Sequence, residues 1–293
     1  MRKNNAIAIL AVFILGSFVF EGCKKREDLR FDSSTNNSEG LSVFDDVYKV
    51  VTEGAEGQSG LNKVEVSTWN LQSSASCATV TLTPLGSEFP KTLTIDFGDG
   101  CTGSDGRYRS GQIVCVFSGL YRAENTEIMV DLVDYELDNY QISRHQMLIT
   151  NKGVNGAGQP YFTVVVHNAS ITSDDGTATW SSTRTRTWVE GSETTWFTID
   201  TTQSSGIMEI NGLLDDVYQI SGTAEGTTRG GVPYTVDITA PLEVQFGCRF
   251  VKAGTLTVNP QNLDVRTIDF GNGDCDEGAS VEVDGNKYSF TMW

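Results

Sequence analysis

The stretch best suited to ligand binding is Thr177–Gly191, which reads TATWSSTRTRTWVEG. Side chains alternate between the two faces of a strand, so threonine and serine would share one face. The other face would carry Trp180, Ser182, Arg184, Arg186 and Trp188, and Trp196 would extend it across the turn at Gly191. Because buried arginines are costly without partners, we expect this face to be at least partly open to solvent. Such a face suits stacking on sugars or gripping peptides, and the structural alternative is a Trp–Arg ladder that stiffens an exposed sheet.

Five acidic residues close to glycines have the oxygen chemistry that calcium prefers. They are Asp99, Asp105, Asp274, Asp276 and Glu277. None of them follows the DxDxDG spacing of a calcium-binding loop, so the alternative is that they form turns on an acidic surface. The sequence therefore predicts no cofactor, and Ca²⁺ is the one metal worth testing.

Catalytic motifs are scarce. The two histidines, His145 and His167, have no cysteines to spare for a closed zinc site. A GxSxG nucleophile elbow is absent from the sequence. These features favour binding without catalysis, and a hydrolase is the third hypothesis.

The phrase TIDFG occurs twice, in Thr94–Cys101 and in Thr267–Cys275, and each copy closes on a cysteine. Each copy also has a cysteine upstream, Cys77 or Cys248, on the far side of a proline-containing break. In an antiparallel hairpin, residues equidistant from the turn lie opposite one another, at the separation that a disulfide needs. The sequence therefore predicts Cys77–Cys101 and Cys248–Cys275 disulfides, in an oxidising compartment.

The two copies define repeat units of about 77–120 and 248–293, one at each end of the domain. Ser110-Gly111 and Asp284-Gly285 would hold equivalent turns in them. Cys115 is left over and is expected to be a buried, unreactive thiol, because its neighbours are apolar.

The elements that must position these residues are strands. From about residue 64 onward, alternating segments are joined by short turns, a pattern typical of an antiparallel meander. The sequence leaves open whether the sheet forms a sandwich or a curled, partly open barrel. One short helix is predicted at residues 42–54, because Val43, Phe44, Val47, Val50 and Val51 recur at helical spacing.

The N-terminus has the features of an export signal. Arg2 and Lys3 precede an apolar run, Ala6–Phe20, that is shorter than the about 20 residues of a spanning helix. The run ends near Gly22-Cys23, which resembles a bacterial lipoprotein signal and implies lipidation of Cys23. We therefore predict a signal peptide at 1–22, a flexible polar tether at 23–41 and a single β domain at 42–293.

The net charge of −17 disfavours nucleic acid and anionic lipid surfaces as partners. The expected membrane contact is the lipid anchor itself. Arg26-Glu27-Asp28 resembles the surface-export signal of Bacteroidetes lipoproteins, and a periplasm-facing anchor is the alternative. The expected location is therefore the outer membrane, with a polysaccharide or a surface protein as partner.

The mature chain resembles a group of Bacteroidetes lipoproteins that carry two IDFG(D/N)G–Cys hairpin repeats. The residues that carry the resemblance are Gly22–Lys25, the two hairpins, Thr183–Trp188 and Gly222–Gly231. The resemblance implies a domain type and no activity. The first hypothesis is thus a lipid-anchored binding module for glycan or protein. The second is a structural or lipid-handling envelope protein with an apolar ligand under the helix.

Overall fold

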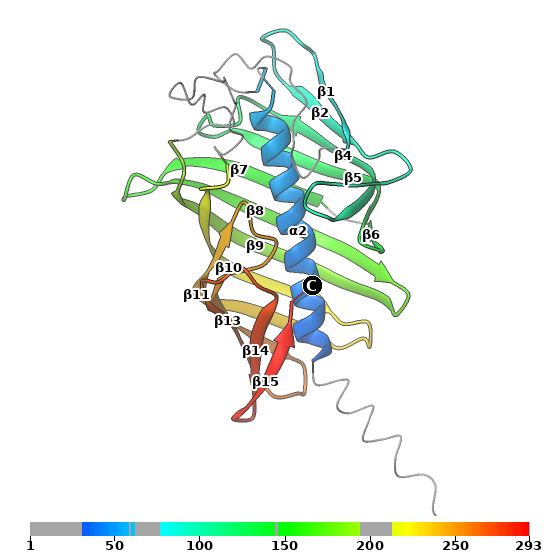
Figure 1. Cartoon of the computed structure of the whole chain (residues 1–293), viewed down its shortest axis with the longest axis vertical. Helices are drawn as coiled ribbons and strands as arrows, with labels where there is room; N and C mark the ends of the chain where they lie inside the picture. The colour runs from blue at the N-terminus through cyan, green and yellow to red at the C-terminus, as the bar shows by residue number, and fades with distance from the viewer. Residues whose placement is uncertain (1–30, 59, 62–76, 144–145, 194–212, 293) are drawn as a thin grey trace, which may run out of the picture.

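The computed structural model describes residues 31–58, 60–61, 77–143, 146–193 and 213–292. In this part of the chain one helix, α2 (Asp32–Glu56), lies along one face of a large antiparallel sheet (Figure 1). The strands are β1 (Thr79–Thr83), β2 (Lys91–Asp96), β3 (Cys101–Thr102), β4 (Tyr108–Phe117), β5 (Glu127–Leu137), β6 (Tyr140–Ser143), β7 (Gln146–Val154), β8 (Pro160–Ser173), β9 (Gly176–Glu190), β10 (Val217–Thr227), β11 (Pro233–Gln245), β12 (Ala253–Pro260), β13 (Arg266–Asn272), β14 (Gly278–Val283) and β15 (Asn286–Thr291).

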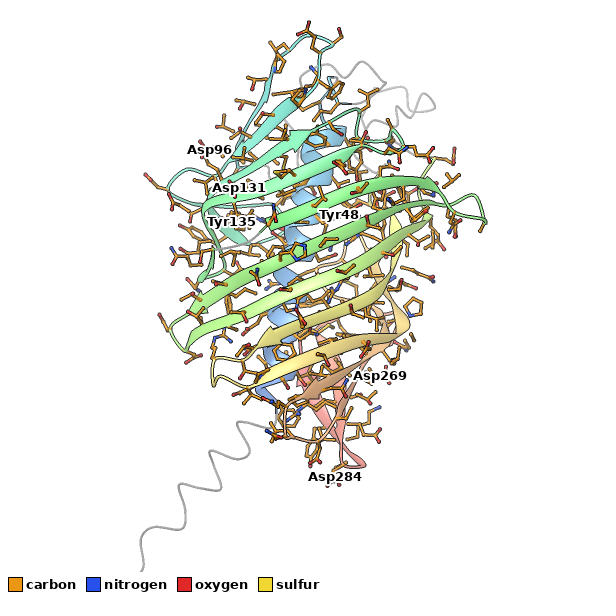
Figure 2. All side chains as sticks on the ribbon, turned by 180° about the vertical axis from the view of Figure 1, so that it is seen from behind. Tyr48, Asp96, Asp131, Tyr135, Asp269 and Asp284 are labelled. Atoms are coloured by element: carbon orange, nitrogen blue, oxygen red, sulfur yellow. A yellow bond between two sulfur atoms is a disulfide. The ribbon has the colours of Figure 1, made fainter. Side chains whose placement is uncertain are left out.

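The strands form one 15-stranded meander in which neighbours in sequence are mostly neighbours in space. The order runs from β1 through β2, β4, β5, β6, β8 and onward to β15, with β3 beside β4 and β7 between β5 and β8. The prediction of an all-β antiparallel meander with one N-terminal helix is confirmed. The strands form a single sheet that bends around α2, and not two sheets packed face to face (Figures 1 and 2).

Both predicted disulfides are present. Cys77 and Cys101 have Cα atoms 6.0 Å apart, and Cys248 and Cys275 have Cα atoms 5.9 Å apart. They staple the hairpins β1–β2 and β12–β13, which lie toward opposite ends of the sheet. Cys115 is buried and free, as predicted, and burial raises the pKa of its thiol.

The repeated aspartate does the same work in both hairpins. Asp96 accepts a hydrogen bond from the amide of Gly98 at 2.8 Å, and Asp269 accepts one from the amide of Gly271 at 3.0 Å. Both glycines have positive φ, which lets the chain turn there. Asp96 and Asp269 lie far apart on the sheet, because each belongs to its own terminal hairpin (Figure 2).

The second half of the repeat is not equivalent in the two copies. Asp284-Gly285 forms the turn between β14 and β15, but Ser110-Gly111 lies inside β4 at a shift of register against β5. A Cβ atom on Gly111 would come within 2.3 Å of the Asp134 carbonyl oxygen. The glycine therefore permits a β-bulge instead of a turn.

The helix begins ten residues before the predicted start, so residues 32–41 belong to α2 and not to a tether. These residues are polar and give no apolar period, yet most are buried. Their partners are distant in sequence and come from β9 and from the turn between β10 and β11. Trp180 Nε1 donates to Asn37 at 3.2 Å, and Glu39 pairs with Arg229 at 2.8 Å. Tertiary contacts thus stabilise the helical conformation of residues 32–41, which the local sequence pattern does not predict.

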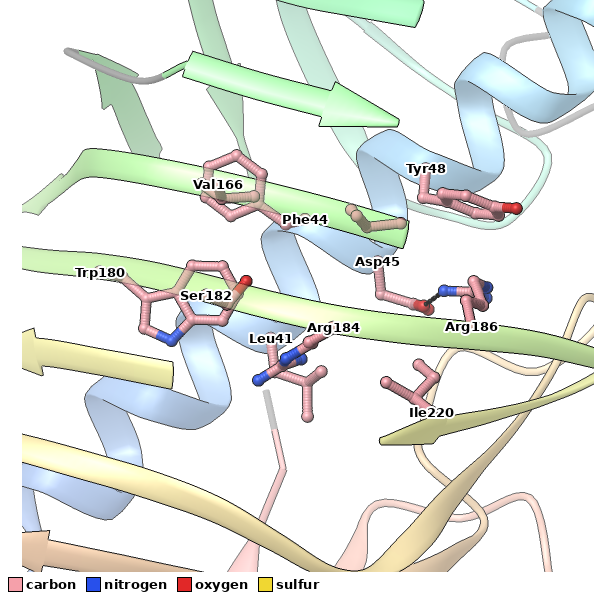
Figure 3. Close-up of a pocket in the computed structure, with 11 residues that line it drawn as sticks. Leu41, Phe44, Asp45, Tyr48, Val166, Trp180, Ser182, Arg184, Arg186 and Ile220 are labelled. Atoms are coloured by element: carbon pink, nitrogen blue, oxygen red, sulfur yellow. Dashed lines mark hydrogen bonds and ion pairs between the residues drawn. The ribbon is translucent and has the colours of Figure 1, made fainter. Parts of the chain in front are cut away.

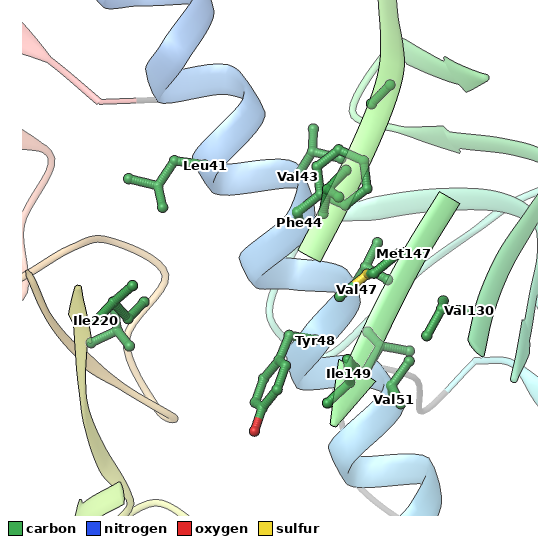
Figure 4. Close-up of a cluster of buried hydrophobic side chains, with 14 of the residues drawn as sticks. Leu41, Val43, Phe44, Val47, Tyr48, Val51, Val130, Met147, Ile149 and Ile220 are labelled. Carbon is green, nitrogen blue, oxygen red and sulfur yellow. The ribbon is translucent and has the colours of Figure 1, made fainter. Parts of the chain in front are cut away.

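One face of α2 packs into a dry apolar core. Val43, Val47 and Val51 lie against Val130, Met147 and Ile149 of β5 and β7 (Figure 4). Farther along, Gly54 lets the helix approach Leu93 and Ile95 of β2, because a Cβ there would lie 2.9 Å from Ile95. This contact fixes the distance between α2 and the N-terminal half of the sheet, and so positions the opposite face of the helix.

Candidate ligand site between the helix and the sheet

The tryptophan–arginine face of β9 points toward α2, and the expectation that it is partly open to solvent is wrong. Trp180 and Trp188 are each 2 % exposed, Arg186 is 4 % exposed and Arg184 is 7 % exposed. Threonines hold the opposite face, as the alternation predicts. The arginines can be buried because α2 supplies the Asp45 carboxylate and the rings of Phe44 and Tyr48, and no local pattern predicted that α2 would lie there.

Asp45 of α2 is the carboxylate at the centre of this interface. It pairs with Arg186 of β9 at 2.5 Å and with Lys49, one helical turn away, at 3.1 Å. Burial alone would raise the pKa of Asp45, and the two cations more than reverse that effect, so the pKa is lowered and the group is ionised. The Lys49 ammonium also donates to the carbonyl of Cys248 at 2.6 Å, which joins the helix to the second disulfide hairpin.

Arg184, two residues from Arg186, has no carboxylate of its own. Its Nε and Nη2 atoms are buried without a hydrogen-bond partner among the described residues. The guanidinium lies 4.9 Å from the ring of Trp180, which itself stacks on Phe44 of α2 at 5.3 Å. Burial lowers the pKa of Arg184 to about 10, so the group is still cationic at neutral pH.

Three small cavities lie beside α2 and all share Asp45 as a lining residue. The first, of about 30 Å³, lies between α2, β8, β9 and β10 (Figure 3). Its lining consists of Leu41, Phe44, Asp45, Tyr48, Val164, Val166, Trp180, Ser182, Arg184, Arg186 and Ile220. A second, of about 140 Å³, includes Lys49, Arg107 and Arg249, and a third, of about 20 Å³, is bounded by Leu41 and Met292.

Positive charge exceeds negative charge around these cavities, although the whole chain is strongly acidic. The cations are Lys49, Arg107, Arg184, Arg186 and Arg249, and the carboxylates are Asp45, Asp46 and Asp105. Arg109 pairs with Asp46 and Asp105, and Asp138 pairs with Arg107 and Arg249. With these partners included, six cations face four carboxylates, which leaves a local surplus that a bound anion would neutralise.

The neighbouring residue, Asp46, also lines the second cavity, but its partners are arginines of β4 and of the turn before it. Arg109 holds it with Nε at 3.0 Å and Nη2 at 2.5 Å, and Arg107 lies 3.4 Å away. The same Arg109 also binds Asp105 at 2.6 Å. Burial raises the pKa of Asp46 and the arginines outweigh it, so the pKa is lowered.

Trp188 does not line the Arg184 cavity. It stacks on Tyr218 at 5.3 Å and lies 4.7 Å from the Arg122 guanidinium, which pairs with Glu56 at the end of α2. Tyr218 also lies 4.6 Å from the Arg186 guanidinium and so connects Trp188 to the residues of the cavity. Trp196, the fifth predicted ligand residue, is outside the described residues. The described part of the predicted Trp–Arg face is therefore buried, and Trp188 lies beyond the cavity.

Asp216 is a buried acid that the sequence analysis did not single out. It is fully buried and neither carboxylate oxygen has a hydrogen-bond partner in the described part of the chain. Burial raises its pKa to about 8, and the nearby Asp215 adds to the shift. At neutral pH Asp216 is mostly protonated, so it does not offset the surplus of positive charge.

The five acids considered for calcium do not meet at one site. Asp105 is bound to Arg109, and Asp276 accepts a hydrogen bond from the amide of Gly278 at 2.7 Å. Across the described residues, no group of three or more histidine, cysteine, aspartate or glutamate side chains could hold a metal ion. His167 is exposed on β8, and Cys23 and His145 lie outside the described residues.

A sequence signal for this site existed in VFDDVYK, where Asp45, Asp46 and Lys49 interrupt an apolar helix. Ionisable residues at i and i+4 on a buried helix require partners, and the paired arginines of TRTRTW are of complementary charge. The sequence alone did not show that these two segments meet.

None of the helices that the structure describes is long and apolar enough to cross a membrane. Comparison with protein-family models, with curated proteins and with solved structures finds no significant match.

Proposed function

We propose that this chain is a lipid-anchored protein of the cell envelope that binds a ligand between α2 and the sheet and leaves it chemically unchanged. The single observation that carries the binding function is the group of cavities around Asp45, in which cations outnumber carboxylates. The anchor rests on the signal-like N-terminus ending at Cys23. The two disulfides fit an oxidising compartment outside the cytoplasm.

Binding without catalysis is supported by the state of the acids that line the cavities. A general base works best with a pKa near the operating pH. The pKa values of Asp45 and Asp46 are instead lowered by their arginine and lysine partners. Such carboxylates hold position and charge, and they are poor proton acceptors.

The size and lining of the cavities favour a small polar ligand. A water molecule needs about 10–15 Å³ of such space, so the cavity of about 30 Å³ at Arg184 has room for two or three water-sized groups. Covalently bonded atoms lie closer together than separate waters, so an anion of three or four non-hydrogen atoms fills about this space. Sugar stacking on Trp180 has no support, because the ring is buried under Phe44. The lipid-handling alternative would require α2 to leave the sheet, since an acyl chain is far larger than these spaces.

Binding is tested by native mass spectrometry of the full chain incubated with a small-molecule extract of the cell envelope. A bound mass should appear and be released unchanged. Leu41→Trp should abolish it, because Leu41 lines two of the cavities and the larger ring fills them. Leu137→Phe, at a buried position that lines none of these cavities, is the matched overpacking control. If no small molecule binds, or if Leu41→Trp has no effect on binding, the interior site is wrong.

The anchor is tested separately by labelling cells with a radioactive fatty acid. The wild-type chain should carry the label and sediment with membranes, and Cys23→Ser should do neither. A Cys23→Ser chain that still carries the label would contradict the anchor.

A further inference from the structure

The free edge of Arg184 has a defined geometry. Nε and Nη2 lie on the same side of a guanidinium and present two parallel N–H groups, the arrangement that binds the two oxygens of a carboxylate. Both of these atoms are buried and without a partner in the described chain. Arg184 also lines a cavity, so there is room beside it for such a partner (Figure 3).

The protein uses the same edge elsewhere to hold a carboxylate. Arg109 donates from Nε to Asp46 Oδ2 at 3.0 Å and from Nη2 to Asp46 Oδ1 at 2.5 Å. Arg109 and Arg184 are both buried and each lies beside α2. The difference is that, within the part of the chain that the structure describes, Arg109 has a carboxylate partner at this edge and Arg184 has none.

The aspartate nearest to Arg184 is already committed. Asp45 pairs with Arg186 at 2.5 Å and with Lys49 at 3.1 Å. Three cations on this side of the helix thus share one carboxylate. A buried charge without a counter-charge is costly, and a monovalent anion beside Arg184 would remove that cost.

We infer that Arg184 binds a small planar oxyanion, and specifically the carboxylate of a short monocarboxylate, in the cavity beside Trp180. Two oxygens would face Nε and Nη2. The remaining one or two carbon atoms would lie against Leu41, Val166 and Ile220, which line the same cavity. This inference rests on the proposed function, because it names the class of ligand that the interior site accepts.

Other anions fit less well. Chloride would neutralise the charge but could not engage two N–H groups along parallel directions. Sulfate is divalent and has five non-hydrogen atoms, which is too many for a cavity of about 30 Å³, and its tetrahedral oxygens would press on Leu41, Val166 and Ile220. The shape of the site should therefore favour a carboxylate over chloride and over sulfate.

The test is thermal unfolding of the full chain in sodium formate, acetate, chloride or sulfate at constant ionic strength. Formate and acetate should raise the unfolding midpoint saturably, as expected for a ligand that binds only the folded state. Chloride and sulfate should raise it less at every concentration. Equal shifts with chloride and acetate would overturn the inference, because they would indicate a point-charge effect.

Variants locate the effect. Arg184→Met should abolish the carboxylate-induced shift, and Arg184→Lys should weaken acetate affinity by about tenfold or more, since lysine lacks the two-donor edge. Lys287→Gln is the matched control, because it also removes a cation, lies on the surface away from these cavities and should leave the shift unchanged. An undiminished shift in Arg184→Met would overturn the inference.

The unfolding midpoint of Arg184→Met without added anion separates a binding role of Arg184 from a structural role, because the two roles predict changes of opposite sign. If Arg184 only supports Trp180, its loss lowers the unfolding midpoint and no anion changes it, which overturns the inference. If the site is vacant without ligand, methionine leaves the midpoint unchanged or raises it. An envelope ligand that Leu41→Trp abolishes but Arg184→Met retains would overturn this inference and leave the proposed function standing.

Discussion

Two adjacent residues of one helical turn, Asp45 and Asp46, lead into regions of opposite character. On the Asp46 side, Arg107 and Arg109 face three carboxylates, Asp46, Asp105 and Asp138, at distances between 2.5 and 3.4 Å. On the Asp45 side, three cations share the single carboxylate of Asp45. Each arginine of the first region has a carboxylate partner, whereas Arg184 in the second region has none among the described residues.

Buried arginines therefore have two roles in this protein. Those paired with Asp46 stabilise the fold, and Arg184 is available to bind a ligand. Ion pairs that are complete fix the register of α2 against the sheet, because breaking one strands a buried charge. Arg184 is equally buried but has no carboxylate partner among the described residues, so it does not fix this register, and its burial costs free energy. Each region is also tied to one disulfide hairpin, since Arg109 lies opposite Cys101 and Lys49 donates to Cys248.

The largest expected effect is at Arg109. Arg109→Met should lower the free energy of unfolding by about 3–5 kcal/mol, because it leaves the buried Asp46 without its bidentate partner. Urea denaturation measures the change, and the double variant Arg109→Met/Asp46→Leu should recover much of the loss. Arg184→Met, measured alongside, strands no carboxylate. An equal loss in both single variants would erase the contrast between the two regions.

Removal of one disulfide should rank next. Cys248→Ser/Cys275→Ser opens a link across 27 residues and should cost about 3 kcal/mol on the chain-entropy account. It should also reduce acetate binding, because Lys49 depends on the Cys248 carbonyl for its position. Thermal unfolding with and without acetate measures both effects. Cys77→Ser/Cys101→Ser, across 24 residues, should cost a similar amount and leave acetate binding intact. Loss of binding in both variants would contradict the division.

Asp216 gives a pH-dependent test of a buried acid near Trp188, outside both regions. Its pKa is raised to about 8 in the folded chain, against 3.8 for an ordinary aspartate. Between those values the folded state binds one proton more than the unfolded state, so this group's stabilising contribution falls as pH rises and levels off above about 8. Asp216→Asn should match the wild type near pH 4 and be more stable by about 2 kcal/mol near pH 9. Urea midpoints across this range measure the difference, and a gap that does not widen with pH would contradict the assignment.

The smallest effect is expected at the surface. Lys287 and Asp269 lie 3.8 Å apart and are both exposed, so Lys287→Ala should change the free energy of unfolding by no more than about 0.5 kcal/mol. This variant gives the reference value for losing an exposed cation, against which the losses at the buried arginines are compared. A loss of several kcal/mol would show that charge pairs in this protein do not divide by burial.

Local patterns predicted the covalent and secondary structure of this protein well. The hairpin symmetry around Cys77–Cys101 and Cys248–Cys275 was readable, because distance from a turn decides which residues meet. Alternation along β9 correctly separated the threonine face from the Trp–Arg face. The solvent exposure of the Trp–Arg face was predicted wrongly. Exposure depends on what packs over a face, and α2, which covers this one, lies more than a hundred residues away in sequence.

The sequence by itself determined an antiparallel meander with two stapled hairpins, since turns, alternation and cysteine spacing act over tens of residues. Only the tertiary structure decided that residues 32–41 are helical and that Asp45 pairs with Arg186 while Asp46 pairs with Arg109. It also decided that, among the described residues, Arg109 has a carboxylate partner and Arg184 has none. The physical reason is that buried charge is governed by partners brought together in space, and no local pattern in the chain specifies which partners will meet.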